Sequence, residues 1–438
     1  MSAPSVAPEA PETPWPSPLR AWWVLVVFFI TAIVYYTDRL ILNLLVDPIR
    51  AELLLSDTQI SLLQGVAFAL VYAFAGLPLG RVADLMPRRT VMIVGVIVWS
   101  AATVACGFAN SFTELFAARM LVGIGEAALA PAAVSMICDY FPPHRRGTAF
   151  AVFMTGMSVG SSLSIVVGGG LLEAANSGWF ASIPGIAALS PWRAALVLLA
   201  LPSLLIVGLL LTVREPVRRG STQPNGAKIP LREAVQRLSE RRQILIPLYL
   251  AVAMVSVGDV ALQNWTPTLL SRRFEYSPGE IAAILGGVAL IMGIIGSLFG
   301  GVFADYLYNR GGSRARLAAA CVTTLLAVGG SLIALASNGL SAVAIFALWS
   351  FMASISGAIG ITTIQAVVPD EIRGIGTSLV SFGNILLGMG LGATLPALFT
   401  DYVYGDPLAV GWSITTIAGP AGLLAAFLFW RARQAFKK

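Results

Sequence analysis

Apolar runs that are long enough to cross a lipid bilayer recur along the whole of this chain. A transmembrane α-helix needs about 20 mostly apolar residues. Charged residues make up only 11% of the 438 positions and hydrophobic residues 57%, which leaves too little charge to cover a water-soluble protein of this size. We place twelve segments at residues 22–46, 58–82, 90–108, 114–138, 147–172, 192–213, 244–269, 279–304, 315–336, 340–366, 374–399 and 410–431. The sequence therefore predicts an all-α membrane protein with twelve transmembrane helices.

The chain is a duplication, because residues of its first half recur 221 positions later. Asp38 lies deep in the first apolar segment, and Asp259 lies at the matching place in the seventh. The same offset relates further pairs, which are Asn43/Asn264, Ser56/Ser277, Ile60/Ile281, Gly65/Gly286, Gly80/Gly301, Ala83/Ala304 and Asp84/Asp305. Two pseudo-symmetric six-helix bundles related by an axis along the membrane normal are an arrangement that secondary transporters use.

A polar, arginine-rich stretch separates the two halves. We expect a disordered cytoplasmic tail over residues 1–20, a six-helix bundle over 21–213, a cytoplasmic linker over 214–243, a second six-helix bundle over 244–432 and a short cytoplasmic tail over 433–438. Apolar residues at helical spacing in the linker fit a short amphipathic helix over 230–242 on the membrane surface, although a plain tether fits nearly as well.

The second helix of each half begins with the same local pattern. Ser56 is followed three residues later by Gln59, and Ser277 is followed by Glu280. In such a capping box the serine oxygen accepts a free backbone N–H, while the third residue reaches back to the backbone of the serine. The pattern predicts matching helix starts in the two halves.

The positive charges gather on one side of the predicted bundle. Of the 28 Lys and Arg residues, 22 fall in the tails and connections of one side, four fall on the other side and two lie within helices. Basic residues stay on the cytoplasmic side of a membrane, so both termini are expected in the cytoplasm, with the protein in the inner membrane of a cell. This asymmetry explains the net charge of +6 without a nucleic-acid partner. Arg272 and Arg273 run against the trend.

Four charged residues lie where a membrane protein normally has none. Asp38 and Arg39 are in the first segment; Arg119 and Glu126 are in the fourth, seven residues apart and thus on nearly the same helix face. A carboxylate there needs a partner, a water-filled cavity or a protonation cycle. Burial disfavours its charged form and a nearby guanidinium favours it, so such a group can load and release a proton. The alternative is a structural ion pair that only fixes helix packing.

Adjacent helical residues do not face each other, so Arg39 need not pair with Asp38 and can present its guanidinium to a substrate phosphate or to Glu126. Arg119 is a second candidate for binding an anion. Asp259 is a candidate for coupling in the second half, although symmetric repeats often keep only one active copy.

Residues 80–89 read Gly-Arg-Val-Ala-Asp-Leu-Met-Pro-Arg-Arg and resemble the signature loop of the major facilitator superfamily, Gly-x-x-x-Asp-(Arg)-x-Gly-Arg-(Arg/Lys). The match departs from the family pattern at positions 85 and 87. The resemblance implies that Asp84, Arg88 and Arg89 hold the cytoplasmic gate closed when the cavity faces outward. Asp139 is a carboxylate that Arg88 and Arg89 can bridge to. We group Arg146, which lies in a repeated Pro-x-x-x-Arg-Gly pattern, with these gating residues. The alternative is a loop that only sets topology.

Two further motifs are similar to those of the Spinster branch of this superfamily. Residues 35–39 read Tyr-Tyr-Thr-Asp-Arg, with Tyr35 in place of the branch's usual Asn, and residues 123–127 read Gly-Ile-Gly-Glu-Ala. Spinster proteins are proton-linked exporters of amphipathic lipids, including sphingosine-1-phosphate and lysophospholipids. The resemblance implies that Asp38, Arg39 and Glu126 face a central cavity.

The energy source follows from what the sequence lacks. No Gly-Lys-Ser/Thr loop for nucleotide phosphates exists, so an ion gradient or the substrate's own gradient must drive transport, and buried carboxylates beside arginine favour protons over sodium. One histidine, His144, excludes a His-rich metal or haem site. We predict a monomeric secondary transporter, not an enzyme, without cofactor or metal, that exports amphipathic lipids or hydrophobic anions. A multidrug or organic-anion porter is the alternative within transport, and a lipid-binding membrane receptor the alternative outside it.

Overall fold

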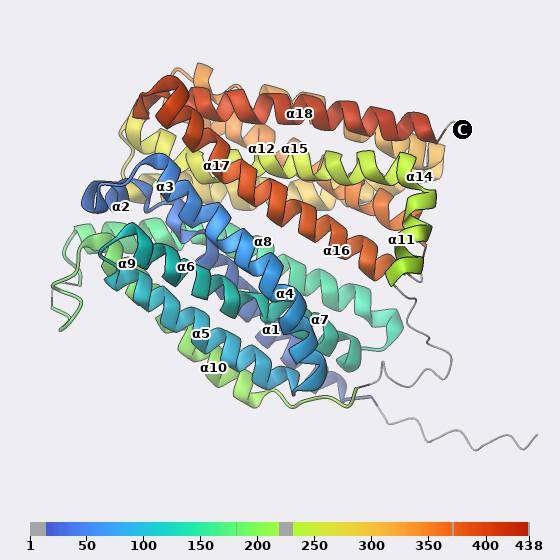
Figure 1. The fold of residues 1–438 in the computed structure, drawn as a ribbon, viewed down its shortest axis with the longest axis horizontal. Helices are drawn as coiled ribbons and strands as arrows, with labels where there is room; N and C mark the ends of the chain where they lie inside the picture. Colours follow the sequence, from blue (N-terminus) through green and yellow to red (C-terminus); the bar gives the residue numbers. More distant parts are fainter. Residues whose placement is uncertain (1–14, 181, 219–230, 370–371, 437–438) are drawn as a thin grey trace, which may run out of the picture.

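The computed structural model describes residues 15–180, 182–218, 231–369 and 372–436, apart from the side chains of a few residues in these ranges, Asp84 among them. These ranges contain helices and no strand. Figure 1 shows two bundles of roughly parallel helices, one coloured blue to green and the other yellow to red. The predicted all-α class is confirmed.

The first half of the chain forms one bundle. Its elements are α1 (Pro18–Leu40), η1 (Ile41–Asn43), α2 (Val46–Leu53), α3 (Asp57–Ser61), η2 (Leu62–Val66), α4 (Ala67–Leu85), α5 (Arg88–Phe108), α6 (Phe112–Ala127), α7 (Leu129–Tyr140), α8 (Pro143–Asn176), α9 (Pro191–Leu199) and α10 (Leu201–Thr212). A short helix, α11 (Leu231–Glu240), follows where the sequence predicts one over 230–242.

The second half forms the other bundle. Its elements are α12 (Arg242–Phe274), α13 (Pro278–Ile281), η3 (Ala282–Gly286), α14 (Gly287–Gly329), η4 (Ile333–Leu335), α15 (Gly339–Val367), α16 (Arg373–Gly383), η6 (Asn384–Met389), α17 (Gly390–Leu398), η7 (Phe399–Tyr404), η8 (Pro407–Ala409) and α18 (Val410–Ala435). The elements η2, η3, η6 and η7 are π-helical turns, while η1, η4 and η8 are 3-10 turns.

Each of the twelve predicted segments lies on a helix or on consecutive helices. Within the described ranges, ten stretches are long and apolar enough to span a membrane. One of them, Pro278–Leu335, is 58 residues long and holds two predicted segments. It divides at Gly311 and Gly312, where the backbone leaves the helical conformation; Gly312 has a φ of 62°, which glycine adopts without strain. The predicted segment 58–82 corresponds to α3, η2 and α4.

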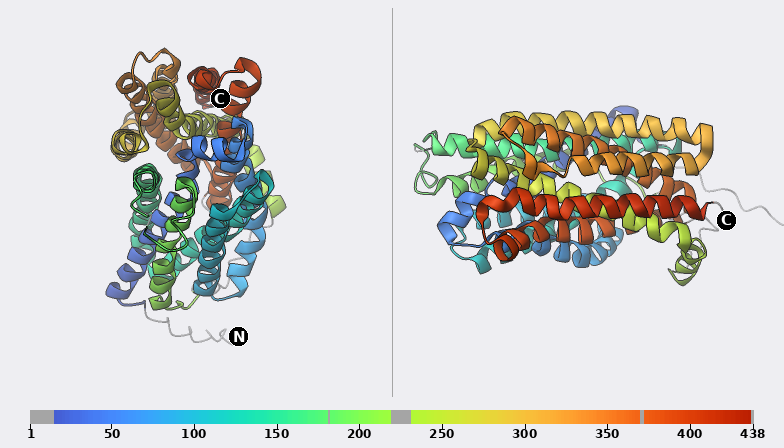
Figure 2. Two further views of the ribbon diagram at one scale, coloured as in Figure 1. Left: turned by 90° about the vertical axis from the view of Figure 1, so that its left-hand side faces the viewer. Right: turned by 90° about the horizontal axis from the view of Figure 1, so that it is seen from above.

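The bundle has two distinct ends. The α2 end carries α2, α3 and the start of α18, and the linker end carries α11, the start of α1 and the end of α18 (Figures 1 and 2). Both predicted capping boxes are present at the α2 end, one between Ser56 and Gln59 and one between Ser277 and Glu280. The repeated sequence pattern therefore produces the same helix start in both halves.

The two halves meet mainly between mid-depth and the α2 end. Among the described residues, the hydrogen bonds between halves include Asn43 Nδ2 to Asn264 Oδ1 at 2.9 Å, and Thr58 to Asp401 at 2.7 Å from both its backbone N and its Oγ1. Glycines permit close approach in the same region, since a Cβ on Gly65 would lie 2.7 Å from the Met389 carbonyl oxygen and one on Gly169 would lie 2.5 Å from that of Pro278. These contacts seal the α2 end in this conformation.

Candidate functional site

Four buried charged side chains come together at mid-depth in the first bundle. Asp38 and Arg39 lie at the end of α1, and Arg119 and Glu126 lie on α6. Glu126 is close enough to Asp38, Arg39 and Arg119 to interact electrostatically with all three. The structure therefore gathers into one cluster the residues that the sequence singled out in two separate segments, and we call these four residues the central cluster.

Close packing of α5 against α6 positions Glu126. A Cβ on Gly125 would lie 2.6 Å from the backbone nitrogen of Trp99, and one on Gly95 would lie 2.7 Å from the carbonyl oxygen of Gly125. Small residues at such a contact let two helix backbones approach closely. Gly125 of the Gly-Ile-Gly-Glu-Ala motif thus serves tight packing, whereas a Cβ on Gly123 would make only ordinary contacts with Phe68, the nearest at 3.4 Å.

Asp38 is held by a residue that the sequence analysis did not identify. The hydroxyl of Thr103, on α5, lies 2.8 Å from Asp38 Oδ2 and 3.1 Å from Oδ1, and both side chains are buried. Thr103 is an ordinary residue in an apolar helix, and nothing in its local sequence marks it. Only the tertiary fold, which brings α5 near the end of α1, places its hydroxyl at the carboxylate.

Arg39 is surrounded by aromatic rings, and no carboxylate among the described residues forms a hydrogen bond with it. Its guanidinium carbon lies 4.1 Å from the ring centre of Phe68, with the rings of Tyr35, Tyr36 and Tyr72 within 5.5 to 6.0 Å. One amino group donates to Tyr35 Oη at 3.0 Å and the other to Met389 Sδ in the second half, also at 3.0 Å. As expected for adjacent helical residues, Arg39 does not pair with Asp38.

Glu126 is the most isolated of the four. It is 0% exposed, and neither of its carboxylate oxygens has a hydrogen-bond partner among the described residues. Arg119 is also buried and donates to the backbone oxygen of Arg39 at 3.2 Å, while its Nε finds no partner in the same part of the chain. Buried polar atoms are almost always satisfied in proteins, so each exception calls for a functional or structural explanation.

Asp259 stands apart from the central cluster, on α12 in the second half. It accepts a hydrogen bond from Gln263 Nε2 at 2.8 Å and is half-buried, and no cation among the described residues forms an ion pair with it. The repeat therefore preserves the carboxylate but not its surroundings, because the matching position to Arg39 is Val260.

The signature loop forms a network at the linker end. Arg88 forms an ion pair with Asp139 on α7 and donates to Ser135 Oγ at 2.9 Å. It also pairs with Glu215 at 2.8 Å, and the backbone N of Arg89 donates to the other oxygen of Glu215 at 2.9 Å. The sequence predicts the contact with Asp139 but not the one with Glu215, which lies just after α10.

The remaining predicted gating residues occupy different places. The Arg89 guanidinium donates a hydrogen bond to the carbonyl oxygen of Val213 at 3.1 Å. Arg146, near the start of α8, donates to the carbonyl oxygen of Phe141 at 3.1 Å, just before that helix begins. Neither side chain contacts Asp139 in these hydrogen bonds. The side chain of Asp84 lies outside what the structure describes. In the described ranges, no group of three His, Cys, Asp or Glu side chains is placed to hold a metal ion.

Comparison with known proteins places the chain in a family. Residues 27–393 match the model of the Major Facilitator Superfamily. The chain is 28% identical over 441 residues to an MFS-type efflux pump of Mycolicibacterium smegmatis, covering 100% of this chain and 98% of the relative. It is 26% identical over 299 residues to Protein spinster of Drosophila melanogaster, covering 66% of this chain and 46% of that protein.

A solved structure shares the fold over nearly the whole chain. It is a bacterial homolog to the human lysosomal transporter Spinster in an inward-facing and unoccupied conformation, with a TM-score of 0.80, 24% identity, and coverage of 96% of this chain and 98% of that one. The resemblance read from the sequence motifs is confirmed. The chain belongs to the Major Facilitator Superfamily of membrane transporters, and Spinster proteins are among its relatives.

Proposed function

We propose that this transporter exports amphipathic anions, of the lysophospholipid or sphingoid-phosphate class, in exchange for protons. Asp38 and Glu126 carry the proton, and Arg39, assisted by Arg119, binds the anionic head group. Asp259 contributes a second carboxylate from the other half. Four steps support the proposal.

The observation that carries it is the isolation of Glu126. A fully buried carboxyl group without a hydrogen bond or a direct ion pair is far less costly when it is protonated and neutral. In another conformation, a closer guanidinium or entering water would favour its ionised form. A group whose surroundings change in this way between two states can take up a proton on one side of the membrane and release it on the other.

The charge of the central cluster suits an anion. With Glu126 protonated, Asp38 contributes one negative charge, and Arg39 and Arg119 contribute two positive charges, so the cluster carries a net charge of +1. Among the described residues, the hydrogen-bond acceptors of the Arg39 guanidinium are a phenol and a thioether, which are weaker acceptors than a phosphate or carboxylate. An anionic head group would therefore displace these partners and form a charge-assisted bond.

Arg39 also connects substrate binding to the movement of the halves. Its hydrogen bond to Met389 crosses from the first bundle to the second. Because an arriving anion would compete for the same guanidinium, binding would remove one contact that holds the halves together. This is the behaviour that a transporter needs if only the loaded protein is to change conformation.

We assign the linker end to the cytoplasm, on the basis of the basic residues that lie there. The structure is then closed toward the outside, as in the inward-facing relative. In this assignment Asp84, Arg88, Arg89, Asp139 and Arg146 belong to the cytoplasmic gate. The Arg88 network joins the signature loop to α7 and to the beginning of the linker, which would keep the loop rigid while the gate opens and closes.

Transport by purified protein in liposomes tests the proposal. We expect counterflow of a labelled lysophospholipid, and uptake that responds to an imposed pH gradient. Asp38→Asn and Glu126→Gln should fold, retain substrate binding and lose the response to the pH gradient. Gradient-driven transport at the wild-type rate in both variants would contradict the assignment of the proton to these residues.

The relative from Mycolicibacterium smegmatis supports one other candidate, the efflux of drugs or organic anions. The central cluster would bind the anion of such a substrate in the same way. Competition separates the two candidates. Excess unlabelled lysophospholipid should abolish counterflow if the substrate is a lipid. Counterflow of a drug or sugar acid that lysophospholipid leaves unchanged would favour the drug or organic-anion porter.

A further inference from the structure

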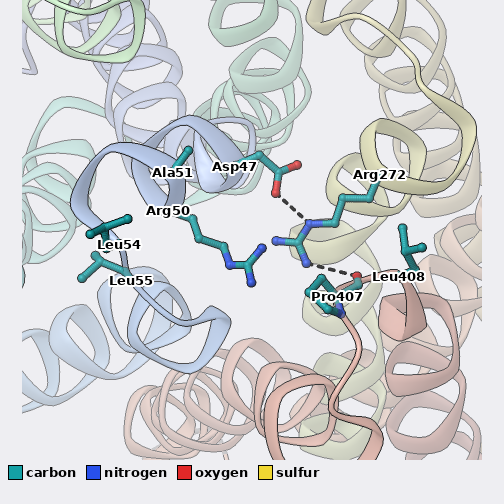
Figure 3. Close-up of a pocket in the computed structure, with 8 residues that line it drawn as sticks. All are labelled: Asp47, Arg50, Ala51, Leu54, Leu55, Arg272, Pro407 and Leu408. Atoms are coloured by element: carbon teal, nitrogen blue, oxygen red, sulfur yellow. Dashed lines mark hydrogen bonds and ion pairs between the residues drawn. The ribbon is translucent and has the colours of Figure 1, made fainter.

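A second group of charges, separate from the central cluster, lies at the α2 end. Asp47 and Arg50 are on α2, Asp57 is the first residue of α3, and Arg272 lies near the end of α12 in the other half. Asp47, Arg50 and Arg272 line a cleft of about 580 Å³ together with Pro407 of the second half. Figure 3 shows these lining residues. Neither the proton nor the substrate of the proposed function requires these residues.

Arg272 ties the two halves together through Asp57. Asp57 is 0% exposed, and its two oxygens accept hydrogen bonds from the two amino groups of Arg272 at 2.6 and 2.7 Å. Arg272 Nε donates to Asp47 at 2.7 Å, and one amino group also donates to the carbonyl oxygen of Pro407. Such a bidentate pair is among the strongest polar contacts in proteins. It holds the α2 end closed.

A second arginine, Arg50, lies beside the same Asp57 carboxylate. Arg50 Nε lies 3.4 Å from Asp57 Oδ1, and this buried Nε has no hydrogen-bond partner within the described ranges. Figure 3 shows the Arg50 guanidinium directed across the cleft toward that of Arg272. Asp57 therefore has one fully engaged cation from the opposite half and one partly engaged cation from its own half.

Arg50 stays with Asp57 when the halves move. Glu52, two residues further along α2, accepts hydrogen bonds from Trp192 Nε1 at 2.6 Å and Arg193 Nε at 2.7 Å, both on α9 of the same half. These bonds anchor α2 to the first bundle. Separation of the halves at the α2 end therefore takes Arg272 away from Asp57 and leaves Arg50 in place.

We propose that Asp57 exchanges Arg272 for Arg50 when the α2 end opens. A buried carboxylate that loses its only cation is strongly destabilised, which would make the open state rare. Exchange removes most of that penalty, because the Nε and amino groups of Arg50 can take the oxygens that Arg272 leaves. Arg272 thus stabilises the closed state and Arg50 stabilises the open state, although both are cations beside one carboxylate. The inference rests on the family's transport function and not on the identity of the substrate.

The opposite roles give opposite effects for two similar substitutions. Thr113 and Tyr402 are exposed at the α2 end, in the first and second halves respectively. Spin labels at Thr113→Cys and Tyr402→Cys would report the opening as a longer distance between the labels, measured by pulsed electron paramagnetic resonance. The protein would carry Cys106→Ser, Cys138→Ser and Cys321→Ser and sit in lipid nanodiscs without substrate. We expect Arg272→Gln to raise the ratio of open to closed molecules by about a hundredfold, and Arg50→Gln to lower it by about tenfold.

Controls separate exchange from general loss of charge. Arg273→Gln removes the neighbouring cation, whose guanidinium donates to the carbonyl oxygen of Ala334 in the same half, so this variant should not change the ratio. Arg50→Lys keeps the charge but not the two parallel N–H donors, so its ratio should lie between those of Arg50→Gln and the wild type. If the wild-type open state is too rare to measure, the comparison is made in the Asp401→Asn background. This substitution weakens the contact of Asp401 with Thr58 between the two halves. An Arg50→Gln ratio equal to or above the wild-type ratio overturns the exchange.

Discussion

Replacing Gly125 by alanine tests whether glycine positions the central cluster. The added Cβ would lie 2.6 Å from the backbone nitrogen of Trp99 and 2.7 Å from the carbonyl oxygen of Gly95, and these are backbone atoms that cannot rotate away. An ordinary contact begins near 3.4 Å, so α5 and α6 would have to separate by about 0.8 Å. Overpacking of this kind costs about 1–3 kcal/mol. The higher helix propensity of alanine returns only about 0.5–1 kcal/mol.

Gly208→Ala is the matched control, because a Cβ at that position of α10 meets no atom within 4 Å. It should be neutral or stabilising, so the two variants should differ by about 1–3 kcal/mol in the free energy of unfolding. Thermal unfolding of the purified protein in detergent would show the difference. One kcal/mol shifts the midpoint by about 2–4 °C for a unit the size of one bundle, so Gly125→Ala should melt several degrees below Gly208→Ala.

Gly125→Ala should also affect transport. Separation of α5 from α6 moves Thr103 and Trp99 away from the helix that carries Glu126. We therefore expect Gly125→Ala to reduce the rate of transport driven by a pH gradient, while Gly208→Ala leaves that rate unchanged and does not lower the melting temperature. Equal melting temperatures for the two variants would refute the argument that backbone contact at Gly125 sets the position of Glu126.

Three further predictions follow from the site. Thr103→Val should shift the pH profile of transport, because Asp38 loses its hydroxyl donor, whereas Thr103→Ser should keep the wild-type profile. Asp84→Asn should slow transport in liposomes without changing the Kd of the substrate, and a weakened Kd would place this residue in the binding site instead. Burial raises the pKa of the Glu52 carboxyl, but the neighbouring Ser190, Arg193 and Trp192 side chains outweigh it and hold the pKa below its ordinary value. A lowered pKa in the folded state stabilises the protein above the unfolded value of about 4.3 and loses this effect as the pH falls further. Glu52→Gln should therefore lower the melting temperature at pH 7 and have little effect at about pH 3, and an equal loss at both values would exclude the ionic contribution.

The membrane class, the duplication and the starts of the repeated helices could be predicted from the sequence alone. These properties depend on local patterns: the length of an apolar run, the spacing of a Ser and a Gln or Glu, and a constant offset between similar residues. The charged residues of the central cluster also stood out in the sequence, because an ionisable group in an apolar helix is conspicuous whatever its partners are. The family resemblance added the expectation that these residues share one cavity.

Which side chains contact each other could be learned only from the tertiary structure. Thr103 at Asp38, Met389 at Arg39 and Glu215 at Arg88 are partners separated by 65, 350 and 127 positions, and no local pattern marks them. The fold also decided that Gly125 serves close contact, and it explains why Arg272 lies on the side with few basic residues, since Asp47 and Asp57 neutralise it there. The physical reason is that hydrophobic burial depends on composition along a segment, whereas hydrogen bonds and ion pairs depend on atoms from distant segments meeting within about 3 Å.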